Sequence, residues 1–319
     1  MKKIAFEKCC EMENKMGKTV FMFPGQGAQY VGMGKDFYDA FEECRKVYAL
    51  ASEVTGLNIE KLCFEENEDI HITEYTQIAM LTTEAAIYTA LKKAGRQPDA
   101  CAGLSLGEYG ALIASGVMSM EDAFRTVRAR GIFMQQAVPE GGAMSAVLGM
   151  DETKIEQICE TTEGIVSIAN YNCPGQIVIT GEQAAVEAAG TVLKEAGAKR
   201  IVPLKVSGPF HSELLQGAGE KLAEVLADVT IQNFTIPYVS NVTADYVTSP
   251  EPVKSLLQKQ VSSSVRWQQS IERMIADGYD EFVEIGPGRT LAGFMRKINR
   301  DVKTVSIEKL EDYKAYVGE

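Results

Sequence analysis

Histidine is rare in this chain: His71 and His211 are the only two in 319 residues. Long apolar runs are also absent, since no stretch approaches the roughly 18 apolar residues of a membrane helix. The first residues, MKKIAFEKCCEMEN, have no apolar centre like that of a signal peptide. We therefore expect a cytoplasmic protein without membrane contact, in which any histidine chemistry depends on one of two side chains.

Paired cysteines and an excess of positive charge are missing as well. The seven cysteines include no C-x-x-C pair, so reduced thiols are expected rather than disulfides or a zinc site. In a reducing compartment the N-x-T triplets at Asn233 and Asn241 carry no meaning as glycosylation signals. The formal net charge of −12 argues against a nucleic-acid partner. It leaves room for an acidic substrate that is received by a local cation.

The pattern of apolar residues predicts an α/β protein with a large subdomain and a small one. Strand-like runs, TVFMF (19–23) and PDACAGLS (98–105), alternate with helical patterns at 74–95 and 119–138. This alternation is typical of a parallel sheet covered by helices. We expect an α/β-hydrolase-like large subdomain with such a sheet. Residues 1–18 precede the first strand and are expected to form a poorly ordered extension.

Residues 139–207 follow a different order: strand, helix, two strands joined by the turn NCPG, helix and strand. The order β-α-β-β-α-β is that of a ferredoxin-like unit. We therefore predict a ferredoxin-like small subdomain inserted into a discontinuous large subdomain, which is formed by residues 19–138 and 208–319. Ligand clefts often lie at such junctions.

Ser105 lies in GLSLG (103–107), which has the G-x-S-x-G spacing of a nucleophile elbow. An apolar strand pattern precedes it and a helical pattern follows, as a sharp strand-to-helix turn requires. That turn places the hydroxyl at a helix N-terminus, where the dipole and free N–H groups stabilise negative charge. In a chain with 28 glycines the spacing also arises by chance. The motif alone leaves a catalytic and an incidental serine open.

A serine nucleophile needs a base, and histidine is the usual one. His71 lies in the acidic segment EENEDIHITE, where we expect a solvated surface position. His211 follows Gly208 and Pro209 in VSGPFHSEL, directly after the small subdomain. This junction makes His211 the better candidate base, although a lone histidine is often structural.

Two further segments hold candidate binding residues. FPGQGAQYVGMG (23–34) lacks the pattern of a phosphate-binding loop, so Gln26 lies either in a plain tight turn or beside a ligand at the strand ends. The helical pattern SMEDAFRTVRARG contains Arg125, Arg128 and Arg130. Most helix arginines are solvated, but a buried one would be a natural partner for a substrate carboxylate.

Taken in order, these segments resemble the malonyl-CoA:acyl carrier protein transacylase family of bacterial type II fatty acid synthesis. The resemblance extends from about residue 18 to 307. Its matching blocks are FPGQGAQYVGMG, GLSLGEYGAL, RARGIFMQQAVPEGGAM, NYNCPGQIVITG, VSGPFHSELL, SNVTA and EIGPGRTL.

The resemblance implies a role for each matching residue. Ser105 would be the nucleophile and His211 its base, without a carboxylate as third member. The backbone N–H groups of Gln26 and Leu106 would form an oxyanion hole. Arg130 would bind the free carboxylate of malonate through two hydrogen bonds.

Three more positions complete the implied site. The main-chain carbonyl of Gln260 would orient the imidazole, and Phe210 would narrow the pocket against an α-methyl group. Leu104 departs from the family, which usually has histidine directly before the nucleophile. The Ser–His pair is unaffected by this difference, but the polar support that the histidine gives to the elbow is in question.

The implied reaction is a ping-pong transfer of malonyl from malonyl-CoA to the phosphopantetheine thiol of acyl carrier protein, by a monomer without metal or redox cofactor. Three alternatives stay open: an acyltransferase serving a polyketide synthase, a thioesterase-like hydrolase, and a non-catalytic interaction module. Because carrier proteins are typically acidic, we expect cations at the mouth of the cleft. The candidates are Lys199, Arg200, Lys205, Arg266 and Arg289.

Overall fold

The computed structural model describes residues 17–138 and 140–319. The predicted extension therefore lies outside the described residues, except for its last two positions. The first strand, β1, begins at Lys18, one residue earlier than predicted. None of the helices in the described ranges is both long enough and apolar enough to cross a membrane.

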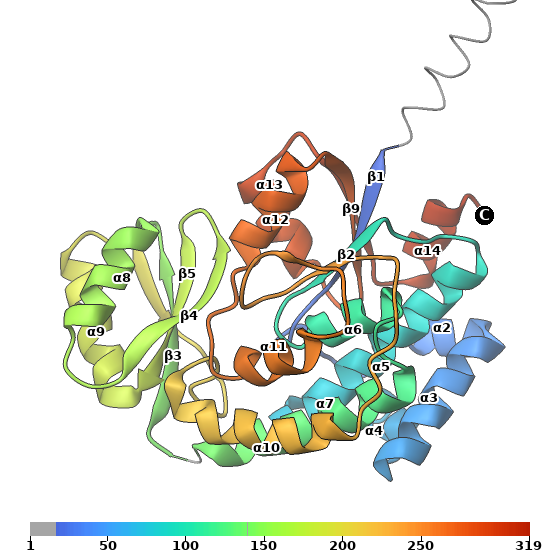
Figure 1. The fold of residues 1–319 in the computed structure, drawn as a ribbon, viewed down its shortest axis with the longest axis horizontal. Helices are drawn as coiled ribbons and strands as arrows, with labels where there is room; N and C mark the ends of the chain where they lie inside the picture. The colour runs from blue at the N-terminus through green and yellow to red at the C-terminus, as the bar shows by residue number, and fades with distance from the viewer. Residues whose placement is uncertain (1–16, 139) are drawn as a thin grey trace, which may run out of the picture.

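The large subdomain is built on a six-stranded sheet with the order β10-β9-β1-β2-β7-β8 (Figure 1). Its strands are parallel except at the β8 edge, where β7 and β8 pair antiparallel. Their bounds are β1 Lys18–Phe23, β2 Ala100–Gly103, β7 Tyr238–Val239, β8 Tyr246–Val247, β9 Tyr279–Ile285 and β10 Lys303–Ile307. The predicted parallel sheet is confirmed.

Helices cover both faces of this sheet because β1 is apolar on both sides. Phe21 and Phe23 point into the cluster that contains α5, whereas Val20 and Met22 join the cluster of α12 and α13. The bounds are α2 Lys35–Ala40, α3 Glu42–Thr55, α4 Ile59–Phe64, η1 Asp69–His71, α5 Thr73–Lys93, α6 Gly107–Ala114, α7 Met120–Ala137, η2 Glu213–Leu215, α10 Gln216–Ala227, α11 Val253–Gln260, α12 Trp267–Ala276, α13 Thr290–Ile298 and α14 Leu310–Val317.

Residues 35–55 form two helices, α2 and α3, which are separated by a single residue. Phe41 is extended between α2 and α3 (φ −124°, ψ 127°). Its ring packs against Tyr313, with the ring centroids 5.3 Å apart. A tertiary aromatic contact accompanies the break in the local helical pattern.

The small subdomain is a four-stranded antiparallel sheet with the order β4-β5-β3-β6 and two helices, on the left in Figure 1. Its elements are β3 Gly142–Leu148, α8 Glu152–Thr161, β4 Val166–Cys173, β5 Gln176–Glu182, α9 Gln183–Glu195 and β6 Arg200–Pro203. The ferredoxin-like order is confirmed. The last strand ends at Pro203, a residue that an edge strand tolerates.

A short junction joins the small subdomain to the site. Val265 forms a parallel bridge with Asn170 of β4, and its carbonyl accepts a hydrogen bond from the Tyr171 backbone N–H (2.9 Å). The Ser264 hydroxyl donates to the Ile168 carbonyl (2.6 Å). These bonds hold the segment after α11 against β4.

Candidate active site

Ser105 occupies a strained turn between β2 and α6. Its φ of +54° lies in the left-handed region, which a non-glycine residue rarely adopts. A Cβ on Gly103 would lie 1.9 Å from the Gly107 carbonyl oxygen, and one on Gly107 would lie 2.0 Å from the Phe23 carbonyl oxygen. Only glycine fits on the two sides of the serine, so the turn has the geometry of a nucleophile elbow.

His211 contacts Ser105 from the loop after the small subdomain. Its Nε2 lies 2.7 Å from Ser105 Oγ. Its Nδ1 lies 2.8 Å from the Gln260 carbonyl oxygen and 3.1 Å from that of Ser263. Carbonyls only accept, so Nδ1 carries the proton and Nε2 is free to accept the hydroxyl proton of Ser105.

The imidazole is only 4 % exposed, and its backbone φ is +62°. Burial and the nearby positive charge of Arg130 lower the pKa of His211 to about 4, against the two carbonyl hydrogen bonds. The ring is therefore neutral at pH 7, the form that a base requires. His71, by contrast, is exposed at η1, as predicted.

The structure separates the three arginines of α7. Arg125 and Arg128 form ion pairs with carboxylates, Arg125 with Glu121 and Arg128 with Glu74. Arg130 is only 1 % exposed and points to Ser105, whose Oγ accepts from its Nη2 at 3.2 Å. A single residue of the three therefore enters the site.

Arg130 is held by neutral amides. Its Nη1 donates to Gln77 Oε1 (2.8 Å) and its Nη2 to Gln260 Oε1 (2.9 Å). Within residues 17–138 and 140–319 no carboxylate forms a salt bridge with it. Burial lowers the pKa of this guanidinium from its usual value. The site thus contains a buried cation that forms no salt bridge with a described carboxylate, although the nearby Glu108 acts against the effect of burial on its pKa.

Asn241 holds the backbone of the elbow and was not expected to do so. Its Oδ1 accepts from the Ser105 backbone N–H (2.7 Å), and its Nδ2 donates to the Gly103 carbonyl (2.6 Å). In the sequence it stood out only as an N-x-T triplet and within the block SNVTA. Neither pattern indicates a contact with residues 136 positions away.

Three more side chains of the site were not predicted from the sequence: those of Gln77, Glu108 and Gln260. Gln260 Nε2 donates to the Ser105 carbonyl (2.9 Å) and to Glu108 Oε2 (2.6 Å). Burial raises the pKa of Glu108 to about 7, although hydrogen bonds from Gln260 and Asn241 act against the rise. The only sequence signal for Glu108 is a charge within an otherwise apolar helix, GEYGALIA.

A pocket of about 130 Å³ opens over Ser105. Its lining includes every residue of the catalytic and substrate site proposed from the sequence except Gln260: Gln26, Leu104, Ser105, Leu106, Arg130, Phe210 and His211. The backbone N–H groups of Gln26 and Leu106 have no hydrogen-bond acceptor in the described part of the chain. Both residues line the same pocket as Ser105, and N–H groups without an acceptor suit an oxyanion.

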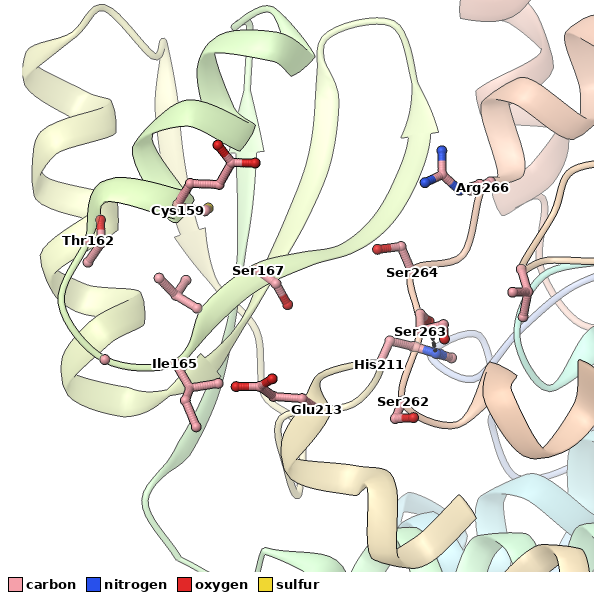
Figure 2. A pocket seen from close by; sticks show the side chains of 14 residues that line it. Cys159, Thr162, Ile165, Ser167, His211, Glu213, Ser262, Ser263, Ser264 and Arg266 are labelled. Carbon is pink, nitrogen blue, oxygen red and sulfur yellow. Dashed lines mark hydrogen bonds between the residues drawn. The ribbon is translucent and has the colours of Figure 1, made fainter. Parts of the chain in front are cut away.

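A second, larger pocket of about 550 Å³ also reaches His211 (Figure 2). Residues of the small subdomain such as Ser167 line one side, and Ser263 and Arg266 line the other. Arg266 also lies over the Tyr171 ring, 5.6 Å from its centroid. The lining includes His211 but not Ser105, so only the smaller pocket contains both members of the pair.

Comparison with known proteins supports a family assignment. The acyl transferase domain family matches residues 20–311. A malonyl CoA-acyl carrier protein transacylase of Bacillus subtilis (strain 168) is 46% identical over 301 residues, which cover 93% of this chain and 95% of the relative. The corresponding enzyme of Staphylococcus aureus (strain MRSA252) is 43% identical, covering 94% and 99%.

Solved structures agree with these relatives. The crystal structure of malonyl CoA-acyl carrier protein transacylase from Clostridium perfringens aligns with a TM-score of 0.91 at 46% identity, covering 94% of this chain and 96% of that one. A type II PKS acyl-carrier protein in complex with its malonyl-transacylase aligns with a TM-score of 0.91 at 38% identity, covering 95% and 100%. The chain belongs to the acyl transferase family, and within it to the malonyl CoA-acyl carrier protein transacylases.

Proposed function

We propose that this enzyme transfers a malonyl group from malonyl-CoA to the phosphopantetheine thiol of an acyl carrier protein of fatty acid synthesis, through a malonyl ester on Ser105. One observation carries the proposal beyond a general acyl transfer. Arg130 is a buried cation with no ionic partner in the described chain, and it donates to the Oγ of Ser105.

Arg130 supports malonyl as the transferred group because a buried unpaired charge is costly. The neutral amides of Gln77 and Gln260 orient the guanidinium but do not neutralise it. The free carboxylate of a malonyl group supplies the missing anion. An acetyl group offers no such charge, so the site favours a dicarboxylic acyl group.

In the first half-reaction, Ser105 Oγ attacks the thioester carbonyl while its proton moves to His211 Nε2, 2.7 Å away. The backbone N–H groups of Gln26 and Leu106 stabilise the oxyanion. The carbon–sulfur bond then breaks, and the departing CoA sulfur takes the proton from His211. The product is a malonyl ester on Ser105.

The second half-reaction reverses these proton movements. The pantetheine thiol gives its proton to the neutral His211, and its sulfur attacks the ester carbonyl. The carbon–oxygen bond breaks, and Ser105 Oγ regains a proton from the imidazolium. Every group used comes from one chain, so a monomer suffices, and no step in the proposed reaction uses a metal or redox cofactor.

Mass spectrometry of the enzyme tests the proposal. After incubation with malonyl-CoA, we expect one malonyl adduct that maps to Ser105 and disappears when fatty-acid carrier protein is added. Ser105→Ala and His211→Ala should lower adduct formation by about 10³-fold or more. Ser255→Ala, a change at an exposed serine of α11, is the matched control.

The fate of the adduct separates the alternatives. Release mainly as free malonate would indicate a hydrolase, and transfer only to polyketide carrier domains would indicate that pathway as the partner. An adduct that forms at full rate on Ser105→Ala would contradict the proposed nucleophile.

A further inference from the structure

Glu108 has no part in the mechanism above, yet it is completely buried at the start of α6. Its Oε2 accepts from Gln260 Nε2 (2.6 Å) and from the Asn241 backbone N–H (3.2 Å). The same two residues hold Ser105: Gln260 Nε2 donates to its carbonyl and Asn241 Oδ1 accepts from its N–H. The Glu108 carboxyl group therefore contacts both of the residues whose side chains hydrogen-bond to the backbone of Ser105.

The side-chain amide of Gln260 has two possible orientations, and Glu108 favours one. In the observed orientation Oε1 accepts from Arg130, while Nε2 donates to Glu108 and to the Ser105 carbonyl. After a flip, an NH₂ group would face a guanidinium, which only donates, and an oxygen would face two acceptors. With Glu108 ionised, each of these contacts would be repulsive, so the network then permits one arrangement.

We propose that Glu108 is a positioning residue for acyl transfer, which holds the Gln260 amide and through it the Ser105 backbone and the Arg130 guanidinium. This role rests on the proposed function. The elbow requires such support because Ser105 is held at a φ of +54°, and strained residues persist only where their surroundings fix them. Glu108 is not among the residues that line the pocket, and the hydrogen bonds of its carboxyl group go to Gln260 and Asn241 rather than to the Ser105 hydroxyl.

A different role for Glu108 would be that of a counter-charge to Arg130. The ionisable groups that influence it are Arg130 on α7, Tyr109 on α6 and Tyr238 on β7. The two roles make different demands. A positioning role needs an acceptor atom at the place of Oε2, whether or not the group is charged. A counter-charge needs the negative charge and tolerates a small displacement.

Two substitutions separate these demands. Glu108→Gln keeps an acceptor oxygen at the same distance along the side chain but removes the charge. Glu108→Asp keeps the charge but is one methylene shorter, so its oxygen moves away from Gln260. Glu84→Asp is the matched control, because Glu84 is also completely buried but has no hydrogen-bond partner in the described residues.

The experiment measures acylation of the full-length enzyme by malonyl-CoA in a quenched-flow instrument, followed by steady-state kcat and KM with acyl carrier protein. We expect Glu108→Gln to acylate within about threefold of wild type. Glu108→Asp should be about 10- to 100-fold slower in kcat, since small misplacements of reacting groups are costly. Its KM for malonyl-CoA should change less than about threefold, and Glu84→Asp should acylate within about twofold of wild type.

This split between kcat and KM distinguishes positioning from a loss of folded protein or of substrate binding. Glu108→Asp acylating at the wild-type rate, or Glu108→Gln slower than Glu108→Asp, would overturn the role of Glu108. A wild-type enzyme that forms no malonyl adduct would instead contradict the proposed function, and this measurement comes before the variants are compared.

Discussion

Glu108 of α6 and Glu84 of α5 are both completely buried, and their surroundings differ. Glu108 accepts two hydrogen bonds and belongs to the network around Ser105. Glu84 of α5 lies beside Gly110 and Gly286, with neither oxygen hydrogen-bonded to any described residue. The same side-chain chemistry is therefore built into a polar network at one place and isolated in apolar packing at the other.

The pKa values follow this difference. Burial raises the pKa of both groups, but hydrogen bonds and Arg130 restrain that of Glu108 to about 7. No group in the described part of the chain restrains that of Glu84, and burial raises it well above 4.5. Burial therefore favours the neutral form of Glu84, because an uncharged carboxyl group is less costly to bury than a carboxylate. A buried polar group with hydrogen-bond partners fixes the geometry of its surroundings, whereas a buried polar group without partners lowers the stability of the fold.

Removing Arg130, the cation held by the hydrogen-bond network of Glu108, should produce the largest loss of activity. Arg130→Ala should lower acylation by malonyl-CoA about 100-fold, because charge-assisted hydrogen bonds to the substrate carboxylate are lost. Acylation by acetyl-CoA should fall less than about tenfold, so the preference for malonyl should shrink. Adduct formation by mass spectrometry with the two donors measures both.

Arg125→Ala provides the control on the same helix, since Arg125 is exposed and pairs with Glu121 and Asp122. It should leave both rates unchanged. Equal losses with malonyl-CoA and acetyl-CoA in Arg130→Ala would show that Arg130 supports the fold of the site rather than the substrate carboxylate.

Substitution of Glu84, the isolated acid, should change the stability of the protein rather than its activity. Burial raises the pKa of Glu84 in the folded protein well above 4.5, the usual value for glutamate, which the unfolded chain keeps. Its contribution to stability is therefore full at low pH and is lost as pH rises towards its folded pKa, by at most ~1.4 kcal/mol per pH unit. Glu84→Met should remove this loss and be more stable than wild type at pH 8.

Urea unfolding at pH 5, 7 and 8.5 measures the effect as the difference in free energy of unfolding between Glu84→Met and wild type. The difference should grow as the pH rises from about 4.5 towards the folded pKa of Glu84. The raised pKa of Glu108 also lowers the free energy of unfolding as the pH rises, but only between about pH 4.5 and its folded pKa of about 7. A pH-independent difference for Glu84→Met would mean that Glu84 is ionised in the folded protein.

Much of the site was accessible from local sequence patterns. The elbow around Ser105 depends on glycines at fixed spacing, and the strand and helix on its two sides follow from local apolar periodicity. His211 was selected because the chain offers only two histidines and the other lies in an acidic segment. These features are properties of short segments, so short segments reveal them.

The supporting residues could not be found in this way. Glu108, Asn241 and Gln260 meet at the elbow from segments 133 and 152 positions apart in the chain. Their roles depend on which amide faces which carbonyl, and no local pattern encodes this. The choice among Arg125, Arg128 and Arg130 likewise became clear only from burial. The split of α2 from α3 coincides with a contact between Phe41 and the distant Tyr313.

The residues of the predicted cationic patch are charged groups that water screens, unlike the two buried acids. Their substitution should have the smallest effects. All five predicted patch residues are exposed. Lys205 lies between Leu204 and Val206, which line the smaller pocket with Ser105, whereas Arg266 lines the larger pocket. Because only the smaller pocket contains the acylated serine, carrier protein should dock on the Lys205 side.

Lys205→Glu should therefore slow transfer from isolated malonyl-enzyme to carrier protein by about three- to tenfold at low salt, and Arg266→Glu by less than about twofold. The deficit of Lys205→Glu should shrink as the ionic strength approaches 1 M, where the screening length falls to about 3 Å. Lys46→Glu on α3 is the control, as a similarly exposed lysine. A larger effect of Arg266→Glu would place the docking face at the larger pocket, and equal rates for all variants would exclude steering by these charges.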